Sequence, residues 1–237
     1  MSPVDALSTA PKSLSIGFLL FPQLTQLDMT APFEVFARMP GATVHLIWKN
    51  FEPVISDRNL AIVPTTTFAD CPPLDVVCVP GGPGQVELMD DEETLTFLKN
   101  VAAGARLITS VCTGSLVLGA AGLLRGYRAT SHWTSVDQLS FFGAEPVTER
   151  VVWDRNRVTG AGVTSGIDFA LTVASSIYGS EIASSIQLQM EYDPMPPFKA
   201  GSPKSASTTL LNAARAAVKD LIEERRAASE RAANRLR

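Results

Sequence analysis

The sequence has few cysteines and no long apolar run. Its three cysteines, Cys71, Cys78 and Cys112, form no CxxC pair, which argues against a disulfide framework and against a zinc site. The first residues carry neither the basic nor the apolar segment of a secretory signal. No apolar stretch approaches the roughly 20 residues that cross a bilayer. We therefore expect a cytoplasmic protein, because free thiols persist in that reducing compartment.

The chain also has no large excess of charge of either sign. The 20 Lys and Arg residues stand against 24 Asp and Glu residues, so the formal net charge is -4 and predicts no attraction to nucleic acid or to anionic membranes. Hydrophobic residues make up 46% and charged residues 19%, which excludes a disordered or fibrous class. The 237 residues fit one large domain. We expect a disordered leader over residues 1–13 and a single domain over residues 14–237.

Short apolar runs alternate with helical segments along the chain. Buried strands are expected at residues 14–20, 44–48, 75–80, 106–111, 151–153 and 157–159. Helices are expected at residues 28–39, 91–103, 113–122 and 165–178, and one long helix at residues 207–235 after a proline-rich loop at 192–203. This alternation predicts an α/β fold with a doubly wound, mostly parallel, flavodoxin-like sheet flanked by helices. The mixed charges from Glu223 onward indicate a solvated helix face.

Cys112 stands between an expected strand and an expected helix. Ligands bind at the carboxyl ends of strands in a doubly wound sheet, and a residue in this turn resembles a nucleophile elbow. The unpaired N–H groups that begin the following helix favour a thiolate and predict a lowered thiol pKa. Cys71 and Cys78 fit the commoner role of small buried apolar residues. The position of Cys112 therefore favours a catalytic role.

A glycine turn ends the neighbouring strand. The backbone amides of Gly81 and Gly82, together with that of Thr113, could form an oxyanion-hole-like site. The glycines could equally serve only to make a tight turn. The turn is neither GxGxxG nor a P-loop, so phosphate binding is disfavoured.

A nucleophilic cysteine needs a proton carrier, and the candidates are few. Of the two histidines, His45 lies inside an expected strand and is interpreted as structural, whereas His132 could either approach the site or pack. Asp28 follows the first strand at the same sheet edge as Cys112. It could carry the proton, cap the first helix, or do both.

The residues around the cysteine resemble a known family. The stretch 109–115, with 80–82 upstream, resembles the ThiJ/PfpI superfamily within the class-I glutamine-amidotransferase-like fold. Further matching segments make the resemblance closer to the bacterial isocyanide-hydrating members: residues 16–22, 27–28, 44–49, 68–75, 118–124, 166–171 and 196–203.

The resemblance implies a homodimer that uses neither a metal nor an organic cofactor. It implies Cys112 as the nucleophile, with Asp28 as its acidic partner beside Thr113, and hydration of an isocyanide to an N-substituted formamide through a thioimidate. Many superfamily proteases carry His directly after the cysteine, where this chain has Thr113, so a Cys-His protease is disfavoured. Ala161 stands where relatives carry glycine, which predicts a changed mobility of the helix near the cysteine.

Two other functions are compatible with such a cysteine domain. One is a glyoxalase-like activity on α-oxoaldehydes. The other is the ligand-sensing part of an AraC-type regulator, which would need an appended helix-turn-helix region. Only one long helix is expected after Pro203, and the chain is acidic, so the regulator is disfavoured. Phe198 could line an apolar pocket or pack within the loop or against a second subunit.

Overall fold

The computed structural model describes residue 11 and residues 13–237. The expected disordered leader lies outside the described residues, apart from Pro11 and Ser13. A seven-stranded sheet runs through the body in the order β10-β11-β7-β6-β1-β2-β5. The strands are β1 (Leu14–Leu19), β2 (Ala42–Trp48), β5 (Thr66–Thr67), β6 (Val76–Val79), β7 (Leu107–Val111), β10 (Val151–Asp154) and β11 (Arg157–Gly160).

The sheet is parallel except at one edge. β1 pairs with β2 and β6, and β7 pairs with β6 and β11, all in parallel, whereas β10 and β11 are antiparallel. Every residue of β6 and β7 is buried, because central parallel strands are covered on both faces. The expected doubly wound, mostly parallel sheet is therefore confirmed.

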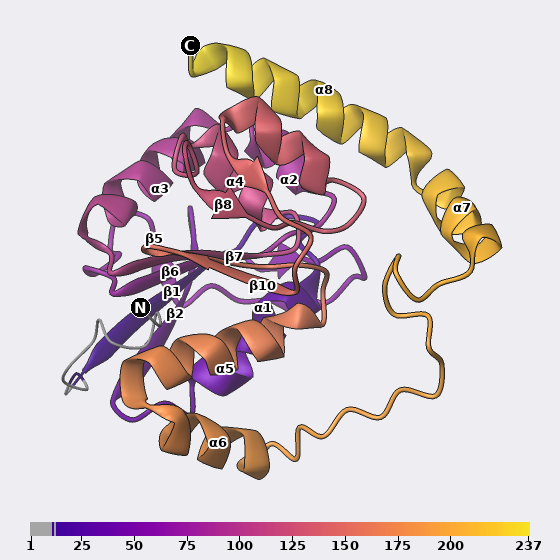
Figure 1. Ribbon diagram of the computed structural model, residues 1–237. Coiled ribbons are helices and arrows are strands. Elements are labelled where there is room, and N and C mark those ends of the chain that lie inside the picture. Colours follow the sequence, from indigo (N-terminus) through magenta and orange to yellow (C-terminus); the bar gives the residue numbers. More distant parts are fainter. Residues whose placement is uncertain (1–10, 12) are drawn as a thin grey trace.

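Helices cover both faces of this sheet (Figure 1). One face carries α1 (Gln26–Phe36), α5 (Ser165–Tyr178) and α6 (Ser180–Gln189). The other carries α2 (Gln85–Leu88), α3 (Glu92–Gly104), α4 (Gly114–Ala120) and α8 (Lys219–Arg235). The Phe36 ring lies 5.9 Å from both Phe18 of β1 and Phe169 of α5, so the core joins the sheet to two helices.

The first helix begins earlier than the sequence predicts. Its N-cap is Thr25, and Pro32 lies inside it rather than in its first turn. Asp28 is therefore not the N-cap but a buried residue of the first turn. Packing of α1 against β1 and α5 stabilises the helix despite the hydrogen bond that Pro32 cannot donate.

The expected C-terminal helix is two helices. A break at Val218, with φ -123°, separates α7 (Thr208–Ala217) from α8. No residue of α7 is buried, whereas α8 packs small side chains on the body. The chain before α7 forms an arm, residues 190–207, that runs around the outside of the body from α6 (Figure 1).

The remaining elements are short and, like β5, α2 and α6, were not expected from the sequence. They are β3 (Val54–Ile55), β4 (Ala61–Ile62), β8 (Arg128–Ala129), β9 (Glu145–Pro146) and the 3-10 helix η2 (Val136–Phe142). None of the helices in the described chain combines the length and the apolar character of a membrane span.

Candidate active site

Cys112 forms the sharp turn between β7 and α4. Its backbone is left-handed, with φ +57°, which is uncommon and strained for a residue other than glycine. Its N–H is shared between the carbonyls of Gly160, at 3.0 Å, and Ala161, at 2.8 Å. Its carbonyl accepts from the hydroxyls of Ser115, at 3.2 Å, and Ser131, at 3.1 Å. These hydrogen bonds hold the strained conformation that aims the side chain away from the strand.

Asp28 lies beside this cysteine and is fully buried. Its Oδ2 accepts the N–H of Gly81 at 2.9 Å. Its Oδ1 has no hydrogen-bond partner among the described residues. Burial raises the pKa of Asp28 to about 7, while the N–H of Gly81 and the neighbouring Cys112 act in the opposite direction. The structure thus brings the carboxyl of Asp28 beside the thiol of Cys112, and each group shifts the pKa of the other.

Cys112 is buried rather than exposed to solvent. The residue is 6% exposed, and burial together with the charge of Asp28 raises the pKa of the thiol above its usual value. The predicted lowering of this pKa is therefore wrong, because desolvation of the anion outweighs the Thr113 N–H and Arg225, which favour it. Burial thus favours the neutral thiol beside a carboxyl group whose pKa is raised to about 7.

The backbone amides of the glycine turn donate hydrogen bonds to side chains of the protein itself. The Gly82 N–H donates to the Thr113 hydroxyl at 3.1 Å, and the Gly81 N–H donates to Asp28. The amides of Gly81 and Gly82 are thus already engaged, and of the three predicted donors the Thr113 N–H is the one that favours the ionised sulfur. A Cβ at Gly81 would lie 2.6 Å from Thr113 Oγ1 and 2.8 Å from Asp28 Oδ2, so the close approach requires glycine.

The two histidines have different places. His45 lies on β2 and contacts the Thr66 hydroxyl at 3.2 Å, as expected for a structural residue. His132 contacts the Thr134 hydroxyl at 2.7 Å and follows Ser131, which binds the Cys112 carbonyl. Burial and the charge of Arg225 lower the pKa of His132 to about 4, so its ring is neutral near neutral pH.

A cavity of about 1010 Å³ opens on the segments around the elbow, and neither Cys112 nor Asp28 is among its lining residues. Its wall contains residues 130–134 and 161–164, the same segments that bind the backbone of Cys112, and residues 201–204 with parts of α7 and α8. Phe198 is not among the lining residues of this cavity and is 77% exposed.

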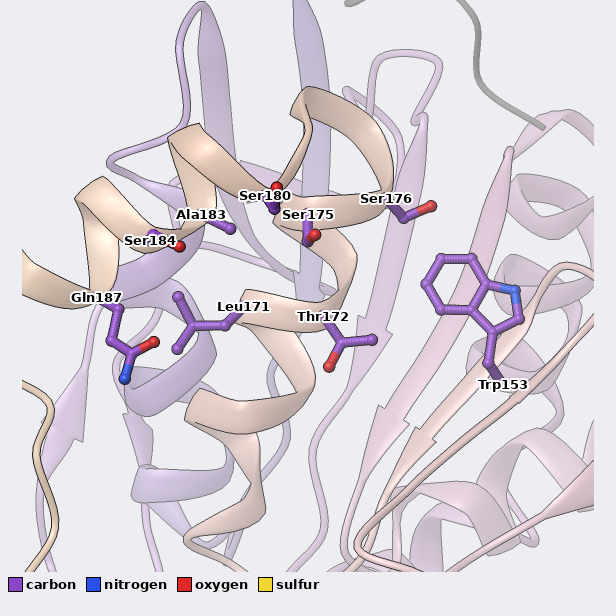
Figure 2. Close-up of a pocket in the computed structure, with 9 residues that line it drawn as sticks. All are labelled: Trp153, Leu171, Thr172, Ser175, Ser176, Ser180, Ala183, Ser184 and Gln187. Carbon is purple, nitrogen blue, oxygen red and sulfur yellow. The ribbon is translucent and has the colours of Figure 1, made fainter. Parts of the chain in front are cut away.

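A second cavity, of about 380 Å³, lies between α5, α6 and Trp153 (Figure 2). Its lining consists of Trp153, Leu171, Ala183, Gln187, Thr172 and four serines, with no cysteine, histidine or acid. It therefore lacks the residues for the chemistry of the elbow.

Sequence reasoning missed one residue near the site. Arg225 on α8 is 5% exposed, although its mixed-charge surroundings indicate a solvated face. The sequence carries no signal that Arg225 is buried, because only the packing of α8 on α2 and α4 turns this side chain inward.

Known proteins are similar to this chain in sequence and in fold. Residues 14–176 match the DJ-1/PfpI family. The isonitrile hydratase of Pseudomonas putida is 54% identical over 94% of this chain and 98% of its own. The crystal structure of a ThiJ/PfpI family protein from Pseudomonas syringae superimposes with a TM-score of 0.90 and 45% identity, over 94% of this chain and 93% of that one. The transcriptional regulator GbdR of Pseudomonas aeruginosa is 30% identical over 76% of this chain, which spans 51% of the regulator.

Proposed function

Since the chain belongs to the DJ-1/PfpI family, we propose that it is an enzyme that adds water to isocyanides, R–N≡C, and releases N-substituted formamides. The observation that carries the proposal is the buried carboxyl of Asp28 beside Cys112 at the strained elbow. The 54% identity to an isonitrile hydratase supports the choice of substrate. The proposed reaction uses neither a metal nor an organic cofactor.

In the first step, Cys112 Sγ attacks the terminal carbon of the isocyanide. The thiol proton passes to Asp28, and from Asp28 to the same carbon, which gives the thioimidate R–N=CH–S–Cys112. A thiol suits this step because the isocyanide carbon is a soft electrophile and covalent capture divides a slow hydration into two steps.

In the second step, water attacks the thioimidate carbon and the carbon–sulfur bond breaks. Asp28 takes a proton from the water and returns one to the departing sulfur. The released R–N=CH–OH rearranges to the formamide R–NH–CHO. The sum is one isocyanide and one water consumed for one formamide formed.

The electrostatics of Asp28 suit this proton transfer. A general acid–base group works best when its pKa lies near the working pH. Burial raises the pKa of Asp28 to about 7, so the group can both take and return a proton near neutral pH. The Gly81 N–H fixes the carboxyl in place.

The cavity beside the elbow supports a substrate route. We assign the approach of the isocyanide to this space, where Trp133 and Val163 offer apolar surface to the R group. Thr113 would position the sulfur through its N–H and hold the glycine turn through its hydroxyl.

Assembly as a homodimer in the cytoplasm belongs to the same proposal. The arm exposes Met195 at 92% and Phe198 at 77%, and a second subunit would cover these side chains. The three free thiols suit a reducing compartment. Light scattering of the purified chain is expected to give twice its mass of 25.3 kDa.

The decisive experiment is a product assay. The purified protein is incubated with an aryl or alkyl isocyanide and, in parallel, with methylglyoxal. Formamide from the isocyanide without lactate from methylglyoxal is expected. Efficient lactate formation without formamide would replace the proposal with the glyoxalase-like function. Isocyanide binding without any turnover would indicate a sensor.

A further inference from the structure

Arg225 is a buried cation whose hydrogen-bond partners are uncharged. Its Nη1 donates to Ser135 Oγ at 2.8 Å. With its amide oxygen turned toward the guanidinium, Gln85 accepts from Arg225 Nε, also at 2.8 Å. These contacts satisfy donors of the guanidinium without neutralising it, and arginine does not lose its proton in proteins. A full positive charge therefore lies inside the molecule.

The other positively charged residues of α8 that form ion pairs lie at the surface, and their partners are acidic side chains. The pairs are Lys219 with Glu223, Arg226 with Asp137, and Arg231 and Arg235 with Asp90. In the part of the chain that the structure describes, no ion pair includes Arg225. The neighbouring α4 has no charged residue, and Glu87 of α2 is exposed. Because an unpaired interior charge is costly, packing alone would favour an apolar residue at this position.

The hydrogen-bond partners of Arg225 belong to segments next to the elbow at Cys112. Gln85 begins α2 directly after the glycine turn, and Ser135 lies in the loop whose Ser131 binds the Cys112 carbonyl. The charge of Arg225 favours the ionised form of Cys112. The guanidinium therefore favours negative charge on the sulfur.

We propose that Arg225 is an electrostatic positioning residue that stabilises the sulfur anion of Cys112 and so draws the thiol proton toward Asp28. The proton leaves Sγ and binds the Asp28 carboxylate, so the charge of the pair is unchanged and only its location moves. The inference rests on the proposed role of Cys112 as nucleophile. It makes the C-terminal helix a part of the active site.

The test is the alkylation of Cys112 by iodoacetamide, located by peptide mass spectrometry and followed from about pH 6 to pH 10. Arg225→Gln is expected to lower the rate at about pH 7.5 by at least about tenfold and to move the pH midpoint upward. Arg225→Lys, which keeps the charge, is expected to stay within about threefold of the parent. Arg231→Gln, on the exposed part of the same helix, is the matched control and is expected to leave the profile unchanged.

A second variant tests the charge without removing the arginine. Gln85→Glu places a carboxylate next to the guanidinium and is expected to slow alkylation as Arg225→Gln does. If Arg225→Gln does not fold, Gln85→Glu decides alone. A parental pH profile in folded Arg225→Gln, or in Gln85→Glu, would overturn the inference. Alkylation needs no isocyanide, so a parent that alkylates as expected but makes no formamide would contradict only the proposed function.

Discussion

Asp28 Oδ2 accepts the backbone N–H of Gly81 at 2.9 Å, and this contact joins the first turn of α1 to the glycine turn after β6. The carboxyl is thereby held at the carboxyl edge of the sheet, where Cys112 ends β7. Without that amide, a buried carboxyl would have still less compensation for its lost hydration. The same contact that stabilises the fold therefore also orients the proposed proton carrier.

Replacing the proposed nucleophile is expected to abolish turnover. Cys112→Ser keeps the shape of the side chain but offers a hydroxyl that ionises far less readily, so formamide formation should fall below detection. Cys78→Ala, at a fully buried position of β6, is expected to cost about 1 kcal/mol of unfolding free energy while activity is kept. Steady-state assays and urea denaturation measure the two effects. Normal activity in Cys112→Ser would refute the assigned nucleophile.

The activity is expected to depend on the ionisation of Asp28. Because burial raises its pKa to about 7, the carboxylate that accepts the thiol proton disappears as the pH falls below 7, and kcat/KM should fall with it. Asp28→Asn should lower kcat/KM by about 100-fold or more and remove this dependence. Asp193→Asn, in the exposed arm, is the control. A parental pH profile in Asp28→Asn would assign the titration to another group.

Stability is expected to respond to the same carboxyl in the opposite sense. Asp28 has a pKa of about 7 in the folded protein, against 3.8 as its ordinary value, so the folded state holds its proton more tightly. This contribution is complete below about pH 4 and is lost as the pH rises through 7. Asp28→Asn should therefore unfold at higher urea than the parent at about pH 8. The gap should shrink as the pH falls toward 4.

The glycine turn should tolerate no side chain at Gly81. An alanine Cβ there would meet Thr113 Oγ1 at 2.6 Å and Asp28 Oδ2 at 2.8 Å, so one of the two must move. A displacement of this size is expected to lower kcat on the order of 100-fold. Gly104→Ala, where a Cβ meets nothing within 4 Å at the end of α3, should keep full activity. Equal kcat in both variants would show that the turn does not orient the site.

Local sequence determined the central strands of the sheet and the place of the cysteine, but not the edge strand β5. Short apolar runs bounded by glycine and proline located β1, β6 and β7 to within about two residues, because central parallel strands are buried on both faces and need continuous apolar sequence. The same pattern placed Cys112 at the end of β7. The sequence also gave Asp28 as a candidate, because it follows β1 at the same edge.

Only the tertiary structure decided which groups face one another and with what charge. The pKa of Cys112, the use of the Gly81 and Gly82 amides by Asp28 and Thr113, and the inward turn of Arg225 all depend on burial by distant segments. The break at Val218 carries no glycine or proline signal. Desolvation and long-range contacts arise only when the helices pack, so no local pattern of residues encodes them.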